Sequence, residues 1–297
     1  MWTVIGSGVL TALGAAIVFG LYLYLYKRSF DMLPATVFTA ALETFGFGWY
    51  LIIAVVSWPT GVAFVPSEAG IADFGLLLGT GLVIAAANLV SVRAFKLGDV
   101  SYIAPLNKLV PIFVVPVELA LLPVSLTGFQ LAGIGLAGAA IYVANYEAGP
   151  LLDPVRRAAR YRPAQLALLG AALFAVGDVS TRAVLTVTSF PAQTVALFSF
   201  AIVALVVIPL SIPRVDLEQL NATIPGLLGL SALFAVGVHL ATISFAAAPA
   251  SIASPLINTQ AILAVLLGSL LLGEGQLGRR LTAAIVAIVG IVLVVGI

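Results

Sequence analysis

The chain has 297 residues, of which 62% are hydrophobic and 8% are charged, and its mean hydropathy is +1.20. A soluble domain could not cover so much apolar surface with polar side chains, so we expect an integral membrane protein. The formal net charge of +1 provides no basic face for nucleic acid, and the absence of cysteine excludes disulfides and thiolate metal sites.

Apolar stretches of about 18 to 26 residues follow one another along the chain, each long enough to cross a bilayer as a helix. Ten can be counted, at residues 3–26, 34–57, 71–96, 101–123, 128–146, 163–188, 191–212, 222–248, 251–272 and 277–297. No room remains for a soluble domain. The pattern predicts an all-α integral membrane protein with ten transmembrane helices, placed in the plasma membrane as a multi-pass protein.

The two halves of the chain carry related sequences. Residues 94–106, AFKLGDVSYIAPL, return as residues 244–256, SFAAAPASIASPL, with Phe, Ser, Pro and Leu repeated at an offset of 150. Because five spans per half is an odd number, the second half should enter the membrane in the opposite direction, which makes the repeat inverted. We expect a first five-helix repeat at 1–146, a basic linker at 147–162 and a second repeat at 163–297. This plan is typical of membrane transporters with a site between the halves.

These features together resemble the drug/metabolite transporter superfamily, EamA type. The resemblance rests on the ten-span plan, on GDVSYIAPL at 98–106 leading to Pro111, and on LLLGE at 270–274. The first half has PVSLT at 123–127 and lacks the glutamate that the family typically has there, which favours a capping role for Glu274. The resemblance implies secondary transport, often export, of small metabolites, amino acids or drugs.

Ionisable side chains at membrane depth are costly and usually face a cavity or a partner. Glu43 lies near the middle of the second span, and Lys108 lies in the fourth span between Pro105 and Pro111. Each proline leaves a backbone carbonyl without its helical donor, which suits a cavity wall, and Pro255 repeats Pro105 in the second half. We expect helix breaks and a cavity at these positions.

Five more polar residues complete the candidate site: Asn88, Asp178, Arg182, Asn258 and Gln260. Asn258 follows Lys108 at the repeat offset of 150, so each half places a polar side chain three residues after the repeated proline. Asp178 and Arg182, four residues apart on one helix face, either belong to the site or only neutralise each other. The three amides either bind substrate or hydrogen-bond neighbouring helices.

Glu43 has no oppositely charged neighbour on its own helix, so Lys108 or a proton must neutralise it. This favours a proton- or gradient-driven carrier that works by alternating access, with Lys108 as countercharge or as anchor for a substrate carboxylate. The alternative is an uncoupled facilitator or exchanger in which Glu43 and Lys108 form a structural pair.

Other functional classes find less support in the sequence. A lipid-modifying membrane enzyme would need a nucleophile with a base or a metal set, and one His with no Cys offers neither. No P-loop pattern occurs, so we expect no ATP hydrolysis and no cofactor. The expected partners are a small-molecule substrate and the lipid bilayer. A fully duplicated chain can form its pathway as a monomer, and the oligomeric state stays open.

Two motif-like features have simpler explanations. Residues 133–138, GIGLAG, match a dinucleotide-binding fingerprint, but no strand precedes them, and small residues in an apolar span indicate close helix packing. His239 stands alone on its span, so we expect a hydrogen bond to a neighbouring helix and not a metal ion.

The distribution of basic residues predicts the orientation of the chain. If both termini lie outside, the cytoplasmic connections hold or adjoin eleven of the 13 Lys and Arg residues: Lys27, Arg28, Arg93, Lys96, Arg156, Arg157, Arg160, Arg162, Arg214, Arg279 and Arg280. Short loops of this kind follow the positive-inside rule. The family resemblance implies both termini in the cytoplasm. We follow the charge count and predict both termini outside, with the 156–162 linker inside.

Overall fold

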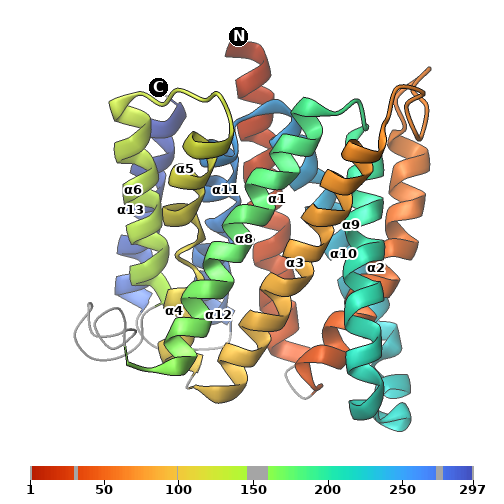
Figure 1. Cartoon of the computed structure of the whole chain (residues 1–297). Coiled ribbons are helices and arrows are strands. Elements are labelled where there is room, and N and C mark those ends of the chain that lie inside the picture. The colour runs from red at the N-terminus through yellow and green to blue at the C-terminus, as the bar shows by residue number, and fades with distance from the viewer. Residues whose placement is uncertain (1, 30–32, 99, 146–159, 272–276, 296–297) are drawn as a thin grey trace.

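The structure, a computed structural model, describes residues 2–29, 33–98, 100–145, 160–271 and 277–295, and in these residues every regular element is a helix (Figure 1). The first half holds α1 (Trp2–Ser29), α2 (Ala35–Ser57), α3 (Ile71–Leu97), α4 (Val100–Asn107), α5 (Val110–Leu121) and α6 (Gly128–Asn145). The second half holds α8 (Arg162–Val187), α9 (Ala192–Ser211), η1 (Ile212–Arg214), α10 (Leu217–Ala247), α11 (Ala250–Asn258), α12 (Gln260–Leu271) and α13 (Leu277–Val295). Glu274 lies outside the described residues.

Several of these helices are built to span a membrane. Seven segments of the described chain are long and apolar enough to cross one, and further shorter apolar helices lie beside them. The all-α membrane class is therefore confirmed, whereas the count of ten spans stays a prediction.

The fourth and ninth predicted spans are not continuous helices. α4 ends at Asn107 and α5 begins at Val110, and α11 ends at Asn258 directly before α12. Each of the stretches predicted as one span at 101–123 and 251–272 therefore consists of two helices separated by a break. The physical reason in the first half is Pro111, which has no N–H to continue the hydrogen-bond ladder.

The packing of the helices repeats when the two halves are exchanged. α3 packs against α8 as α10 packs against α1, and α2 packs against α10 as α9 packs against α3. Two further pairs, α2 with α9 and α6 with α13, join corresponding helices of the two halves. α5 and α11 lie in the upper part of the bundle, and α4 and α12 lie in the lower part (Figure 1). The fold therefore has an approximate two-fold relation with the broken helices beside its centre.

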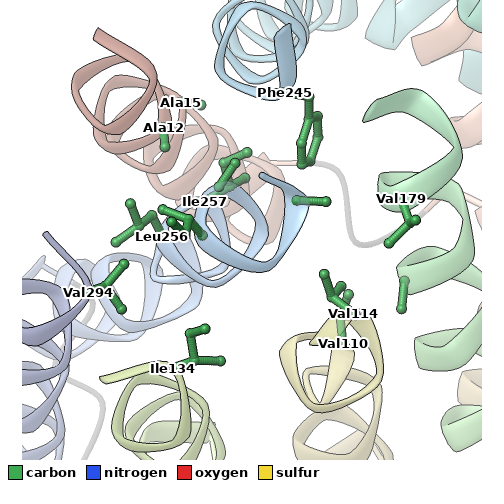
Figure 2. Packing of buried hydrophobic residues seen from close by; sticks show 14 of the residues in the cluster. Ala12, Ala15, Val110, Val114, Ile134, Val179, Phe245, Leu256, Ile257 and Val294 are labelled. Atoms are coloured by element: carbon green, nitrogen blue, oxygen red, sulfur yellow. The ribbon is translucent and has the colours of Figure 1, made fainter. Parts of the chain in front are cut away.

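The short helix α11 lies at the heart of the largest hydrophobic cluster. Its Leu256 and Ile257 lie between Ala12 of α1 on one side and Ile134 of α6 on the other (Figure 2). All nine residues of α11 are buried. Small residues such as Ala12, which is fully buried, let the neighbouring helices approach closely.

The basic residues gather at one end of the bundle. Arg93 and Lys96 lie near the end of α3, Arg160 and Arg162 lie at the start of α8, and Arg214 ends η1. These helix ends lie together at the end opposite to the two chain termini (Figure 1).

Gly133 of the fingerprint-like segment lies at a helix crossing, as the packing interpretation predicts. A Cβ atom added at Gly133 of α6 would lie 2.5 Å from the carbonyl oxygen of Gly290 in α13, and one added at Gly290 would lie 2.8 Å from the carbonyl oxygen of Gly133. The backbones of α6 and α13 therefore meet directly at this pair.

We expect the substitution Gly133→Ala to destabilise the protein by about 1 to 3 kcal/mol, because a new methyl group would force two backbones apart. The matched control is Gly135→Ala in the same helix, where an added Cβ meets nothing within 4 Å. That variant should be neutral or more stable by up to about 1 kcal/mol, since alanine favours helix over glycine. Thermal unfolding of the purified variants measures both effects, and equal transition temperatures for the two would contradict the crossing.

Candidate functional site

A cavity of about 450 Å³ lies between the two halves of the bundle. Helices α1, α2, α3 and the α4–α5 segment form its walls from the first half, and α8, α9, α10, α11 and α12 form them from the second. Its polar lining consists of Tyr22, Glu43, Asn88, Ser91, Asn107, Lys108, Asp178, Thr181, Ser199, Thr242, Asn258 and Gln260. The remaining lining is apolar and mainly aromatic or branched.

The two helix breaks supply this cavity with polar groups. Asn107 ends α4 and Lys108 follows in the turn before α5, while Asn258 ends α11 and Gln260 begins α12. All four side chains line the cavity. The break in each half thus places polar residues in one space, and two of them, Lys108 and Asn258, correspond at the offset of 150.

Six of the seven polar residues predicted from the sequence line the cavity: Glu43, Asn88, Lys108, Asp178, Asn258 and Gln260. Arg182 does not. Of the three prolines, Pro111 and Pro255 are buried at the breaks without lining the cavity, and the side chain of Pro105 is not described.

Glu43 and Lys108 face the same cavity without pairing. Glu43 is buried in α2 with 6% of its surface exposed, and no described residue donates a hydrogen bond to it. Among the described residues no ion pair joins it to Lys108. A structural pair, as the uncoupled alternative requires, is therefore absent from this conformation. Both groups are left to interact with whatever enters the cavity.

Asp178 and Arg182 have separate partners, so the structure does not pair them with each other. The hydroxyl of Ser254 donates to the carboxylate of Asp178. The guanidinium of Arg182 donates to the backbone carbonyls of Phe245 and Ala246, at 2.7 and 2.8 Å. Asp178 is turned to the cavity, whereas Arg182 binds the end of α10.

The side-chain amide nitrogens of Asn88 and Asn258 donate hydrogen bonds to backbone carbonyls. Asn88 Nδ2 donates to the carbonyl of Ile84 at 3.0 Å, and Asn258 Nδ2 donates to the carbonyl of Ser254 at 2.9 Å. Both are bonds to the residue's own helix, so the interhelical bonds expected under the packing interpretation are not the ones formed.

Aromatic rings form one wall of the cavity around Phe234. Its ring centroid lies 5.3 Å from that of Tyr22 and 5.8 Å from those of Phe19 and Phe200. Such a wall offers apolar area and ring edges to a ligand. The cavity can therefore hold a molecule with one polar, charged part and one apolar part.

His239 hydrogen-bonds a neighbouring helix, as its isolation in the sequence predicts. Its Nδ1 lies 3.0 Å from the hydroxyl oxygen of Tyr50 in α2. Within the described chain, no group of three or more His, Cys, Asp and Glu side chains could hold a metal ion.

Comparison with known proteins places the chain in a family. The model of the EamA-like transporter family matches residues 6–146 and matches again over residues 162–296. The chain belongs to the EamA-like transporter family. Among curated proteins none matches it. A solved structure described as the crystal structure of a protein covers 97% of this chain and 97% of its own, with a TM-score of 0.75 and 18% sequence identity, so it shares the fold.

Membership of the drug/metabolite transporter superfamily, which the sequence predicts, is thereby confirmed. As an EamA-like transporter the protein is a multi-pass membrane protein that carries small substrates. The cavity between its two repeats is lined from both halves and has ionisable groups in its lining, and it is the candidate pathway.

Sequence reasoning missed several residues of this EamA-like transporter. Asn107 donates from Nδ2 to Ser91 Oγ at 2.8 Å, and both line the cavity. Gly170 of α8 makes room for this pair, because an added Cβ there would lie 3.1 Å from Asn107 Nδ2. Asn107 is the direct neighbour of Lys108, and this adjacency is the signal that could have identified it.

Glu118 is the most important residue that the sequence analysis passed over. It is fully buried in α5 and accepts hydrogen bonds from two backbone N–H groups of α11. An acidic residue inside an apolar span was the available signal, and it is the same signal that selected Glu43.

Proposed function

We propose that this EamA-like transporter is a secondary carrier that moves a small substrate through the cavity by alternating access and couples this movement to protons. Glu43 is the proton-binding group. Lys108 binds the anionic part of the substrate, and the aromatic wall around Phe234 holds its apolar part. Export of a metabolite, amino acid or drug is the direction that the family resemblance favours.

One observation carries this proposal: Glu43 and Lys108, an acidic and a basic side chain, line the same cavity but do not form an ion pair with each other. An unpaired carboxylate at membrane depth is costly when it is charged. It therefore binds a proton or a cationic group when either can reach it. A carrier can use that preference, because the carboxylate is reached from opposite sides of the membrane in turn.

The two matched repeats support an inverted arrangement with boundaries near 146 and 162. Each repeat supplies one broken helix, and the exchange of halves preserves the helix contacts. Rocking of one repeat against the other around the cavity provides the two access states.

The proposal is tested by finding a ligand and then following its movement. A thermal-shift screen against amino acids, nucleosides, sugars and cationic drugs identifies compounds that bind the folded protein, since such binding raises apparent stability. Counterflow of the best ligand in proteoliposomes then shows carriage. A ligand that stabilises the protein but never exchanges across the membrane would contradict carriage through the cavity.

We further propose that both termini lie outside the cell and that the basic end of the bundle faces the cytoplasm. The gathering of Arg93, Lys96 and Arg214 at one end supports this orientation through the positive-inside rule. A cysteine at the exposed Thr60, in the connection between α2 and α3, should react with a membrane-impermeant maleimide on intact cells, and one at the exposed Glu218 should not. The reverse labelling pattern would establish the opposite orientation, with both termini in the cytoplasm.

A further inference from the structure

The turn between α10 and α11 joins two helix ends that both need hydrogen-bond partners. α10 ends at Ala247 and α11 begins at Ala250, and Ala248 and Pro249 between them are extended. The last carbonyls of one helix and the first N–H groups of the next have no partner within their own helices. Ala248 in this turn and Ala250 and Ser251 at the start of α11 are buried, so the first N–H groups of α11 need partners from the protein.

Glu118 binds the beginning of α11. Its two carboxylate oxygens accept from the backbone N–H groups of Ala250 and Ser251, both at 2.6 Å. The carboxylate comes from α5 in the first half, while α11 belongs to the second. A negative charge at a helix N-terminus is favourable, and hydrogen bonds to an ionised group are among the stronger ones.

Arg182 binds the end of α10 from the opposite side of the turn. Its guanidinium donates to the carbonyls of Phe245 and Ala246, where a positive charge is favourable at a helix C-terminus. Arg182 and Glu118 also attract each other electrostatically across the turn. The two side chains therefore hold α5, α8, α10 and α11 together at one point.

This point lies beside the lining of the cavity. Phe245, whose carbonyl Arg182 binds, lines the cavity with its side chain. One helical turn below Arg182 on α8, Asp178 lines it as well and binds Ser254 of α11. α11 lies in the upper part of the bundle, toward the chain termini (Figure 1). α11 contributes Ile257 and Asn258 to the lining, so its release from Glu118 would move this wall of the cavity.

The other half of the repeat has no equivalent of these two charges. The offset of 150 places Gly268 at the position that corresponds to Glu118. In the first two helices of each half the offset is 157, because Pro34-Ala35 returns as Pro191-Ala192. This offset places Leu25 at the position that corresponds to Arg182. The junction of α3 and α4, at the opposite end, therefore cannot be held by the same pair of side chains.

We propose that Glu118 and Arg182 form a clamp that closes the cavity at the end where the chain termini lie, so that the resting carrier opens at the basic end. The proposal rests on the alternating access proposed above. Both are positioning residues: they act on α11 and α10 and do not touch the substrate.

The test is the side from which a cysteine in the cavity can be reached. Because the chain has no cysteine, Ala241→Cys introduces a single reporter on the cavity wall. The reporter is combined with Glu118→Gln, Arg182→Met or Arg182→Lys, and labelled with an impermeant maleimide in intact cells and in inside-out vesicles. The Thr60→Cys variant identifies which preparation exposes the clamped end. No substrate or gradient is used, so failure of proton coupling leaves this result unaffected.

With the clamp intact, the reporter should be labelled from the basic end and barely from the clamped end. Glu118→Gln and Arg182→Met should each raise labelling from the clamped end roughly tenfold or more, as loss of hydrogen bonds to a charged group shifts an equilibrium by that factor. Arg182→Lys should give a smaller increase, because the charge remains. The matched controls are Glu68→Gln and Arg214→Met, both at exposed positions, and they should change nothing.

Three outcomes would overturn the clamp. The first is fast labelling from the clamped end in the unsubstituted background. The second is an unchanged rate in all clamp variants. The third is an equal rise from both ends together with a lower unfolding temperature, which indicates general loosening. If Glu118→Gln does not fold, the graded comparison of Arg182→Lys with Arg182→Met decides the question alone.

Discussion

Replacing Glu43 by glutamine should abolish accumulation of substrate against its gradient while counterflow continues. Glutamine has the shape of a protonated carboxyl group but cannot release a proton, so the loaded carrier still changes its access state without carrying one. One pH unit is worth about 1.4 kcal/mol, so a carrier that moves one proton per substrate supports about tenfold accumulation per unit. In the Glu43→Gln variant the ratio of substrate concentrations on the two sides of the membrane should fall to about one.

The matched control for this experiment is Glu68→Gln, which makes the same chemical change at an exposed position outside the cavity. It should retain full accumulation. If Glu43→Gln also retains accumulation and its dependence on pH, then Glu43 is not the coupling group. Loss of both accumulation and counterflow in a folded variant would assign Glu43 to substrate binding instead.

Replacing Lys108 by glutamine should weaken binding of a carboxylate-bearing substrate by roughly tenfold to a hundredfold, the effect of losing a hydrogen bond to a charged partner. The affinity for an amide analogue of the same substrate should change little on this substitution, because the analogue offers no negative charge. Titration of the purified protein with both compounds measures the difference. Lys96→Gln removes the same charge from an exposed position at the end of α3 and should leave both affinities unchanged.

The result also separates the two roles considered for Lys108. If Lys108 anchors the substrate, Lys108→Gln weakens binding of the carboxylate compound only. As a countercharge for Glu43, it affects both compounds equally, and the double variant Glu43→Gln/Lys108→Gln then regains affinity that Lys108→Gln alone has lost. Recovery of this kind would contradict the anchoring role.

The sequence was sufficient to predict the class of the fold and most of its helices. Helix α2 begins at Ala35 and ends at Ser57, against a predicted stretch of 34–57, because apolar runs bounded by polar residues and proline determine a membrane helix. The breaks after Asn107 and Asn258 were indicated only as prolines. Hydropathy continues through them, so it cannot distinguish one bent span from two short helices.

Within the candidate site, the individual polar residues were predictable but their partners were not. The cost of burying charge selected Glu43, Lys108 and Asp178 from the sequence, and all three line the cavity. Spacing along one helix suggested that Arg182 pairs with Asp178, whereas tertiary packing brings it to the end of α10. Contacts across 63 residues, as here, are beyond the reach of local patterns.

The role of Glu118 could not be predicted from the sequence for the same reason. Its partners are the N–H groups of Ala250 and Ser251, which follow it by more than 130 residues and are exposed to it only because α11 begins beside α5. The sequence offers the acidic residue, but the helix terminus that it binds exists only in the folded protein.

Movement of protons with substrate through the unmodified protein tests the coupling mechanism most directly. Proteoliposomes loaded with equal substrate concentrations on both sides receive a pH gradient across the membrane, and a pH indicator and labelled substrate are followed together. Coupled transport predicts net substrate movement driven by the gradient, accompanied by proton flux that requires substrate and that disappears in Glu43→Gln. Equal substrate concentrations that persist under the gradient, with exchange still proceeding, would contradict proton coupling and establish an uncoupled facilitator or exchanger.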